Sequence, residues 1–297
     1  KAAERLGAEV RYRHEILGVD VSGPGASLKV KAPDGTTYEV TGRFLLDASG
    51  FGRVLPRLLK LERPSAFPAR RAIFSHVEDR ISPTSGFDRN KIRVGVHPER
   101  VDVWYWLIPF SNGRASLGVV GAQELLAPYA DDLDRGLKAM HFEDPQLKAL
   151  LSNAVWDTPA RQIMGYAADV VSLTGPHFAL LGNAGEFLDP VFSSGVTIAF
   201  KSASLASPLI ERELQGETVD WDSEYSKPLR RGVDTFRSFV ESWYRGAFQD
   251  IIFYKHADPE IRRKICSILA GYAWDMANPF VAEPRRLRSL EEICASP

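Results

Sequence analysis

The sequence between residues 178 and 214 places a short apolar run, a glycine turn and a long helix of small residues in close succession. Residues 178–181 are typical of a buried strand that Gly182 ends, and residues 197–214 carry a helical pattern dense in alanine and serine. Residues 193–195, Ser-Ser-Gly, lie just before that helix, where unpaired N–H groups meet the positive end of the helix dipole. Such an end stabilises an anion or an electron-rich ring. Taken alone, Ser-Ser-Gly before a helix is an ordinary N-cap in most proteins.

A second segment is rich in aromatic residues. Residues 103–109 place Trp104 and Trp106 at strand spacing, so both indoles are expected on the same side of a sheet, and Pro109 is expected to end the strand. Taken alone, this pattern is typical of a packed aromatic strand.

The remaining patterns predict a sheet-rich first half and a helical second half. Further strands are expected over residues 10–21, 27–31, 37–40, 44–46, 72–77, 92–96 and 115–120. Those beyond residue 51 are expected in an antiparallel sheet with one buried face. Residues 125–154 follow a helical pattern, and an aromatic stripe within residues 221–254 indicates the buried face of a C-terminal helix.

Bulk composition argues against several classes of function. The chain has 297 residues, 44% of them hydrophobic and 25% charged, which is ordinary for a globular protein. Its net charge of −1 gives no general attraction for nucleic acid, and no apolar run approaches the length of a membrane span. The six histidines are scattered and Cys266 and Cys294 lie far apart, so we expect no metal, no disulfide framework and a cytoplasmic location.

Taken together, three segments resemble the flavin-dependent halogenases, relatives of the flavin aromatic hydroxylases and geranylgeranyl reductases. The family's W-x-W-x-I-P element is matched by Trp104, Trp106, Ile108 and Pro109. Its F-x-x-P-x-x-S-x-G element is matched by Phe187, Pro190, Ser193 and Gly195. Residues 45–50 resemble the strand-to-loop segment that closes the family's FAD-binding region. The three segments occur in the order that the family shows.

The resemblance implies an α/β (α+β) fold, the C-terminal two thirds of a FAD-binding aromatic-hydroxylase-like fold. Residues 1–50 and 160–216 would be the remaining part of the FAD-binding domain. Residues 51–159 would form an antiparallel substrate-binding sheet with its helices, and residues 217–297 a C-terminal helical region.

The resemblance also implies roles for individual residues. Those implied to bind FAD are Asp47, Gly50, Gly182, Asn183, Asp189, Pro190, Ser193, Ser194, Gly195 and Val196. The backbone N–H groups of Ser194 and Gly195 match those that hold the halide beside the flavin in the family. Those implied to wall the substrate pocket are Trp104, Trp106, Ile108, Pro109 and Phe192.

Phe192 bears on the substrate. The branch that halogenates tryptophan carries a glutamate at the matching position, whereas members acting on phenolic or carrier-bound substrates carry an apolar residue. The implied reaction uses reduced flavin, oxygen and halide to halogenate an electron-rich aromatic compound, presented as a small molecule or on a carrier protein. A separate flavin reductase would supply the reduced flavin.

The chain departs from the family at two places. It contains no G-x-G-x-x-G after a strand, and the family's catalytic lysine would lie upstream of Lys1, so the catalytic residue is unknown and the chain alone is expected to bind FAD poorly. Asn183 stands where relatives more often have an aspartate, which predicts weaker flavin binding. Two alternatives stay open. One is a flavin monooxygenase or reductase that uses no halide, and the other a truncated, non-catalytic relative that serves as a binding protein.

Overall fold

The computed structural model describes residues 1–256 and 258–295, which divide into two compact units. The first unit comprises residues 1–64, 168–238 and 258–287, and the second comprises residues 65–167, 239–257 and 288–297. The predicted boundaries are different, since they assign all of residues 217–297 to one helical region. The domain boundaries expected from the sequence therefore remain a prediction.

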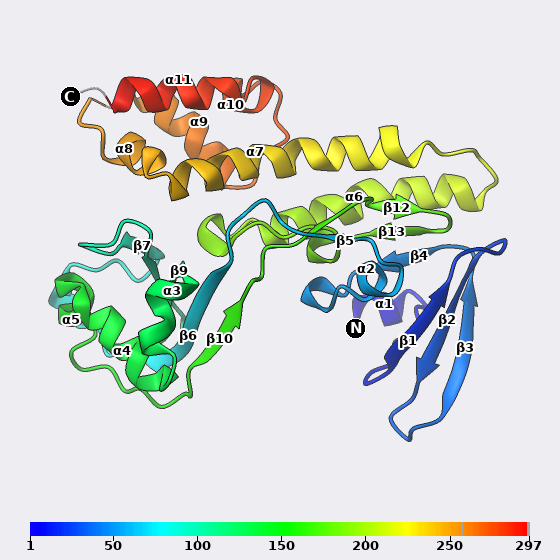
Figure 1. Cartoon of the computed structure of the whole chain (residues 1–297), viewed down its shortest axis with the longest axis horizontal. Helices are drawn as coiled ribbons and strands as arrows, with labels where there is room; N and C mark the ends of the chain where they lie inside the picture. The colour runs from blue at the N-terminus through cyan, green and yellow to red at the C-terminus, as the bar shows by residue number, and fades with distance from the viewer. Residues whose placement is uncertain (257, 296–297) are drawn as a thin grey trace. The chain divides into compact units, whose positions relative to one another are not determined.

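The N-terminal part of the first unit is an antiparallel sheet that Figure 1 shows in blue. Its strands, in spatial order, are β1 (Glu15–Asp20), β2 (Ala26–Lys31) and β3 (Thr37–Gly42), preceded by the short helix α1 (Ala2–Arg5). The predicted strand over 10–21 is wrong at its start, because Arg13 has a left-handed φ of 60° that interrupts extended backbone. The strands expected over 27–31 and 37–40 are confirmed, and they pair with each other antiparallel.

A parallel strand pair joins two distant segments of the first unit. Strand β4 (Leu45–Asp47) pairs in parallel with β13 (Phe178–Leu180), and β12 (Thr174–Gly175) pairs with β13 on its other side. All three residues of β13 are buried, as predicted. Two further short strands, β5 (Glu62–Arg63) and β11 (Asp169–Val170), pair with each other.

The small-residue helix packs closely on the turn after β13. Helix α6 (Gly195–Leu214) begins two residues earlier than predicted and contains Pro208. A Cβ added to Gly182 would lie 2.9 Å from the Ala199 Cβ, so only small residues allow this approach. The Gly182 N–H donates to the Ser202 Oγ at 3.0 Å, which anchors the turn to the helix.

The second unit contains the predicted antiparallel sheet. Its strands, in spatial order, are β10 (Arg161–Met164), β6 (Arg70–Glu78), β9 (Arg114–Ala122), β8 (Trp104–Pro109) and β7 (Arg93–Val96). The predicted helices within 125–154 are confirmed as α4 (Leu133–Glu143) and α5 (Pro145–Leu150), with α3 (Gln123–Leu126) before them. One face of the sheet packs against α4 and α5 through a core that includes Tyr105, Leu107 and Leu147. Burial lowers the pKa of His141, on α4, to about 4, so this core contains a neutral imidazole at physiological pH.

Both indoles lie on the other face of that sheet, as the alternation of β8 predicts. The ring centroids of Trp104 and Trp106 are 5.8 Å apart. Trp106 lies across Gly118 of β9, where any Cβ would overlap its ring. The Trp106 indole N–H donates to the Ser116 Oγ at 3.1 Å, so a glycine and a serine of the neighbouring strand hold this ring.

The C-terminal part of the chain is helical. A π-helical segment (Asp222–Ser226) leads into α7 (Lys227–Tyr244), followed by α8 (Ala247–Phe253), α9 (Pro259–Leu269), α10 (Pro279–Ala282) and α11 (Arg285–Cys294). The single helix predicted over 221–254 is therefore interrupted, because Gly246 takes a left-handed φ of 82°. The predicted burial of the aromatic stripe is confirmed for Tyr225, Phe236, Phe239 and Trp243.

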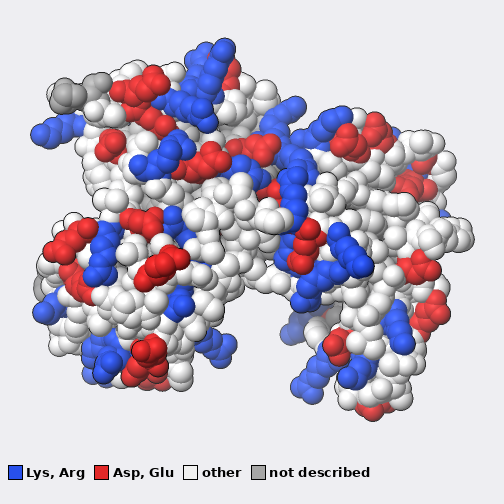
Figure 2. Space-filling view, in the orientation of Figure 1, with Lys and Arg blue, Asp and Glu red and all other residues white. Residues whose placement is uncertain are grey.

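The surface is mixed in charge. Figure 2 shows basic and acidic side chains interspersed over the visible face, in keeping with the net charge of −1. Within residues 1–256 and 258–295, no helix is both long enough and apolar enough to cross a membrane.

Replacing Gly118 with alanine is expected to lower the free energy of unfolding by about 1–3 kcal/mol, because the new methyl group must push the Trp106 ring off the strand. Gly95→Ala, in the same sheet, is the matched control, because its methyl group would meet nothing within 4 Å. Urea denaturation of both variants measures the difference. Equal losses of stability in the two variants would contradict the placement of the Trp106 ring.

Candidate functional site

The parallel pairing of β4 and β13 brings two distant turns to one edge of the first unit. The register pairs Leu180 with Asp47, and the Leu181 N–H donates to the Asp47 carbonyl oxygen at 2.8 Å. The segment after β4 therefore lies beside the segment after β13. Phe51 and Phe187, one from each segment, meet edge to face with ring centroids 4.9 Å apart.

Asp47 and Gly50 shape the first turn. The Asp47 carboxylate is buried and accepts hydrogen bonds from the backbone N–H groups of Ser49 and Leu55, each at 2.7 Å. Gly50 has a φ of 60°, which favours glycine. In this structure the carboxylate thus holds the loop between β4 and the helix α2 (Val54–Leu58).

Arg53 ties the two turns together, and sequence reasoning missed it. Its guanidinium is buried, and Nη2 donates to the Asp169 carbonyl oxygen at 2.9 Å. Nη1 lies 3.4 Å from the Gly185 carbonyl oxygen, and Nε pairs with Glu62 at 3.0 Å. A single arginine in a short segment contributes to no periodic pattern, so only its left-handed φ of 44°, visible in the structure, marks it as unusual.

Asn183 lies in the turn after β13 and faces the start of α6. This turn is the 3₁₀ segment η4 (Gly182–Ala184), and its first residue has a left-handed φ of 52°. The Asn183 Oδ1 is buried and has no hydrogen-bond partner among the described residues. A Cβ added to Gly195 would lie 3.3 Å from that oxygen, so Asn183 and the helix start are in close contact.

The residues from Asp189 to Val196 form the start of α6 itself. Asp189 is buried and caps the 3₁₀ segment η5 (Pro190–Phe192) by accepting from the Val191 N–H at 2.9 Å. Ser193 then takes a left-handed φ of 51°, which turns the chain into the helix. Ser194 is the buried N-cap, yet its side chain makes no capping hydrogen bond. The first N–H groups of this helix are therefore not capped by that side chain, and Val196 beside them is 67% exposed.

Two buried polar side chains support this region from outside the motifs. Glu186, between the two 3₁₀ segments, is 4% exposed and forms an ion pair with Arg237 of α7. The Tyr225 hydroxyl donates to the Leu180 carbonyl oxygen at 2.6 Å, and burial raises the pKa of this phenol. Both contacts attach the later helices to the strand and turn that carry Asn183.

The residues predicted to wall the substrate pocket are divided between the two units. Trp104, Trp106, Ile108 and Pro109 all lie on β8 in the second unit, whereas Phe192 lies in η5 of the first. The predicted FAD-binding residues, in contrast, all lie in the first unit.

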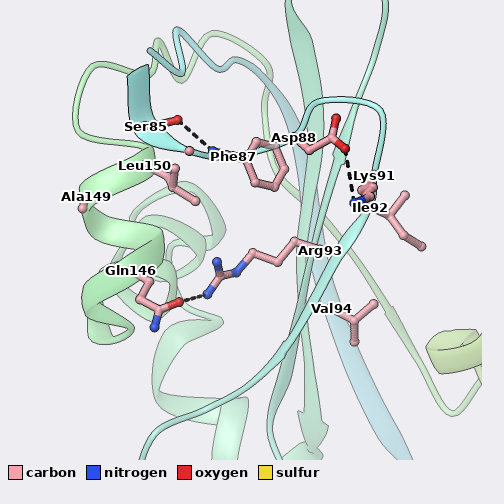
Figure 3. Close-up of a pocket in the computed structure, with 11 residues that line it drawn as sticks. Ser85, Phe87, Asp88, Lys91, Ile92, Arg93, Val94, Gln146, Ala149 and Leu150 are labelled. Atoms are coloured by element: carbon pink, nitrogen blue, oxygen red, sulfur yellow. Dashed lines mark hydrogen bonds and ion pairs between the residues drawn. The ribbon is translucent and has the colours of Figure 1, made fainter. Parts of the chain in front are cut away.

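A hollow of about 880 Å³ lies beside the edge strand of the second unit's sheet (Figure 3). Helix α5 borders it, and Arg93 of β7 points toward Gln146 of that helix, to which it is hydrogen-bonded. Asp88 and Lys91 form an ion pair at its rim, at 3.4 Å. Helix α5 packs on the face of the sheet opposite Trp104 and Trp106, so this hollow is not the pocket that the sequence predicts.

Two solved structures have a similar fold. A flavoprotein/dehydrogenase from Cytophaga hutchinsonii has 37% identical residues and a TM-score of 0.93, over 99% of this chain and 71% of that one. A flavin-dependent brominase shares the fold, with a TM-score of 0.80 and 24% identity over 98% of this chain and 72% of that one.

The sequence relatives point to the same family. A 1H-pyrrole-2-carbonyl-[peptidyl-carrier protein] chlorinase from Pseudomonas fluorescens is 28% identical over 91% of this chain, and the chain spans 60% of that relative's length. The family model described as tryptophan halogenase matches residues 1–270. The chain therefore belongs to the tryptophan halogenase family.

Proposed function

We propose that the whole protein is an FAD-dependent halogenase that acts on an electron-rich aromatic compound. The observation that carries the proposal is the start of α6. There an N-cap without a side-chain capping bond, a left-handed Ser193 and the unpartnered Asn183 oxygen meet at one place. Membership of the tryptophan halogenase family supports the assignment.

The residues at this edge fit a polar cofactor. Asn183 offers a buried acceptor that no described residue satisfies, and an unpaired buried oxygen is costly unless a ligand donates to it. The absence of a side chain at Gly195 keeps the space beside that oxygen open. Asn183, Gly195 and the turn at Asp47–Gly50 would thus hold FAD, which in its reduced form would activate oxygen, the oxidant that converts a halide into an electrophilic halogen.

The residues of the chain would act by position and electrostatics. The N–H groups at Ser194 and Gly195, at the positive end of α6, would hold the halide anion. The Asp189 cap and the left-handed Ser193 fix the direction of those groups. Within the second unit, the indoles of β8 would offer an apolar aromatic wall to a flat ring.

The substrate class follows from the same residues. Phe192 places an apolar ring where the tryptophan-halogenating branch has a carboxylate, which favours a phenol or a carrier-bound pyrrole over free tryptophan. The carrier-linked pyrrole named for the Pseudomonas fluorescens chlorinase supports that class. A halide ion, a separate flavin reductase and a cytoplasmic location belong to the same proposal.

One observation favours a second function. The solved structure that is 37% identical over 99% of this chain is that of a flavoprotein/dehydrogenase. A flavin monooxygenase or reductase would use the same FAD-binding turns and leave the N–H groups of α6 without a halide to hold. Product analysis separates the two functions.

The whole protein, given reduced flavin, oxygen and bromide, is expected to brominate members of a panel of phenols and carrier-bound pyrroles. Mass spectrometry identifies the product by the paired bromine isotopes, and omission of bromide is the control. Addition of oxygen to the same compounds, with no bromination of any of them, would establish the monooxygenase instead.

Gly195→Val is expected to lower the halide-dependent rate about 100-fold or more, because the side chain would fill the space beside Asn183 and the helix N–H groups. Gly95→Val on β7 is the matched control, since its Cβ meets nothing within 4 Å. Steady-state rates at several bromide concentrations, with circular dichroism to confirm folding, measure the effect. A folded Gly195→Val that brominates at the rate of the unchanged protein would exclude this halide site.

A further inference from the structure

A buried arginine lies close to the Trp104 strand in the second unit. Arg70, the first residue of β6, is 6% exposed, and its Nη2 pairs with the Asp102 Oδ1 at 2.8 Å. The guanidinium carbon lies 3.4 Å from the centroid of the Tyr244 ring, at the end of α7. A planar guanidinium stacked on a phenol ring holds that ring by both dispersion and cation–π attraction.

The contacts of this cluster lead back to Trp104. The Trp104 indole is 2% exposed, and its N–H donates to the Tyr244 hydroxyl oxygen at 3.2 Å. Asp102 precedes Trp104 by two residues on the same chain segment. The contacts therefore form a closed ring: Trp104 contacts Tyr244, Tyr244 contacts Arg70, and Arg70 pairs with Asp102, which lies on the same chain segment as Trp104. Each side chain restricts the position of the next one in the ring.

Burial of the Arg70 guanidinium in this cluster is unfavourable for folding stability. Burying a guanidinium costs several kcal/mol in desolvation, and an apolar side chain of similar volume often serves stability as well or better. The Arg70 Nε adds to this cost, because it is buried with no hydrogen-bond partner among the described residues. Unlike an apolar side chain, the Arg70 guanidinium fixes the orientation of the Tyr244 ring. The Tyr244 hydroxyl in turn fixes the orientation of the Trp104 indole.

We infer that Arg70 is a positioning residue for Trp104: with Asp102 it fixes Tyr244, which in turn fixes the Trp104 indole. This rests on the proposed function only in treating Trp104 as a pocket wall. Trp106 provides a contrast, because its ring is held by Gly118 and Ser116 and by no charged group of this cluster. The two indoles of the strand thus have separate supports.

Indole N–H resonances of the ¹⁵N-labelled 297-residue chain test the inference without flavin, halide or substrate. The chain has six tryptophans, and the Trp104 signal is assigned by its loss in Trp104→Phe. Arg70→Lys keeps the positive charge but loses the planar stack on Tyr244. It is expected to move the Trp104 signal and to speed exchange of that N–H with water about tenfold, as expected for a weakened hydrogen bond.

Three further variants make the result decisive. Tyr244→Phe removes the hydroxyl that accepts from the indole, and it is expected to shift the Trp104 signal at least as far as Arg70→Lys does. The double variant Arg70→Lys/Tyr244→Phe is expected to shift the signal no further than Tyr244→Phe alone, because Arg70 acts through the phenol. Arg245→Lys, the same substitution at an exposed ion pair next to Tyr244, is expected to leave the Trp104 signal in place.

An unmoved Trp104 signal in Arg70→Lys, together with a shifted one in Tyr244→Phe, would overturn the inference. Should Arg70→Lys fail to fold, Asp102→Asn takes its place with the same expected shift. Because these measurements involve no turnover, they stand even where the bromination assay fails, and a failed assay with a shifted indole would count against the proposed function alone.

Discussion

The parallel pairing of β4 with β13 decides where every candidate cofactor residue of this chain lies. Parallel strands end at the same edge of a sheet, so the turn after Asp47 and the turn after Leu180 meet there although 130 residues separate them along the chain. Arg53, which follows the first turn, then joins it to the second by donating to the Gly185 carbonyl oxygen, and it also donates to the carbonyl oxygen of Asp169. Helix α6 is anchored to the second turn through Ser202, and its first residue, Gly195, lies beside the Asn183 side chain.

Sequence patterns predict this arrangement where the signal is local. The buried run before Gly182, the small-residue helix and the alternation of β8 each follow from a period of a few residues, and the structure confirms all three. Arg53 and Arg70 could not be found in that way, because each has a partner that is distant along the chain, Asp169 for Arg53 and Tyr244 for Arg70. The early end of the predicted helix over 221–254 depends on one glycine with a left-handed φ, a conformation that the hydrophobic period does not reveal.

In the second unit, one face of the five-stranded sheet packs into the core, and the other face carries the two tryptophans proposed to contact the substrate. Tyr105 and Leu107 alternate with the tryptophans and enter the core with α4 and α5, so the strand is anchored on one side while its indoles remain on the other. Halogenase and monooxygenase chemistry would both benefit from such a wall. What distinguishes them is the anion at the start of α6, which only a halogenase requires.

The most direct test of the account is therefore the position of a bromide ion. Crystals of the whole protein, loaded with FAD and grown in bromide, allow the anion to be located by its anomalous scattering. If the start of α6 holds the halide, a bromide peak is expected within hydrogen-bonding distance of the backbone N–H groups of Ser194 and Gly195. FAD bound in the first unit with no bromide at these groups would contradict it.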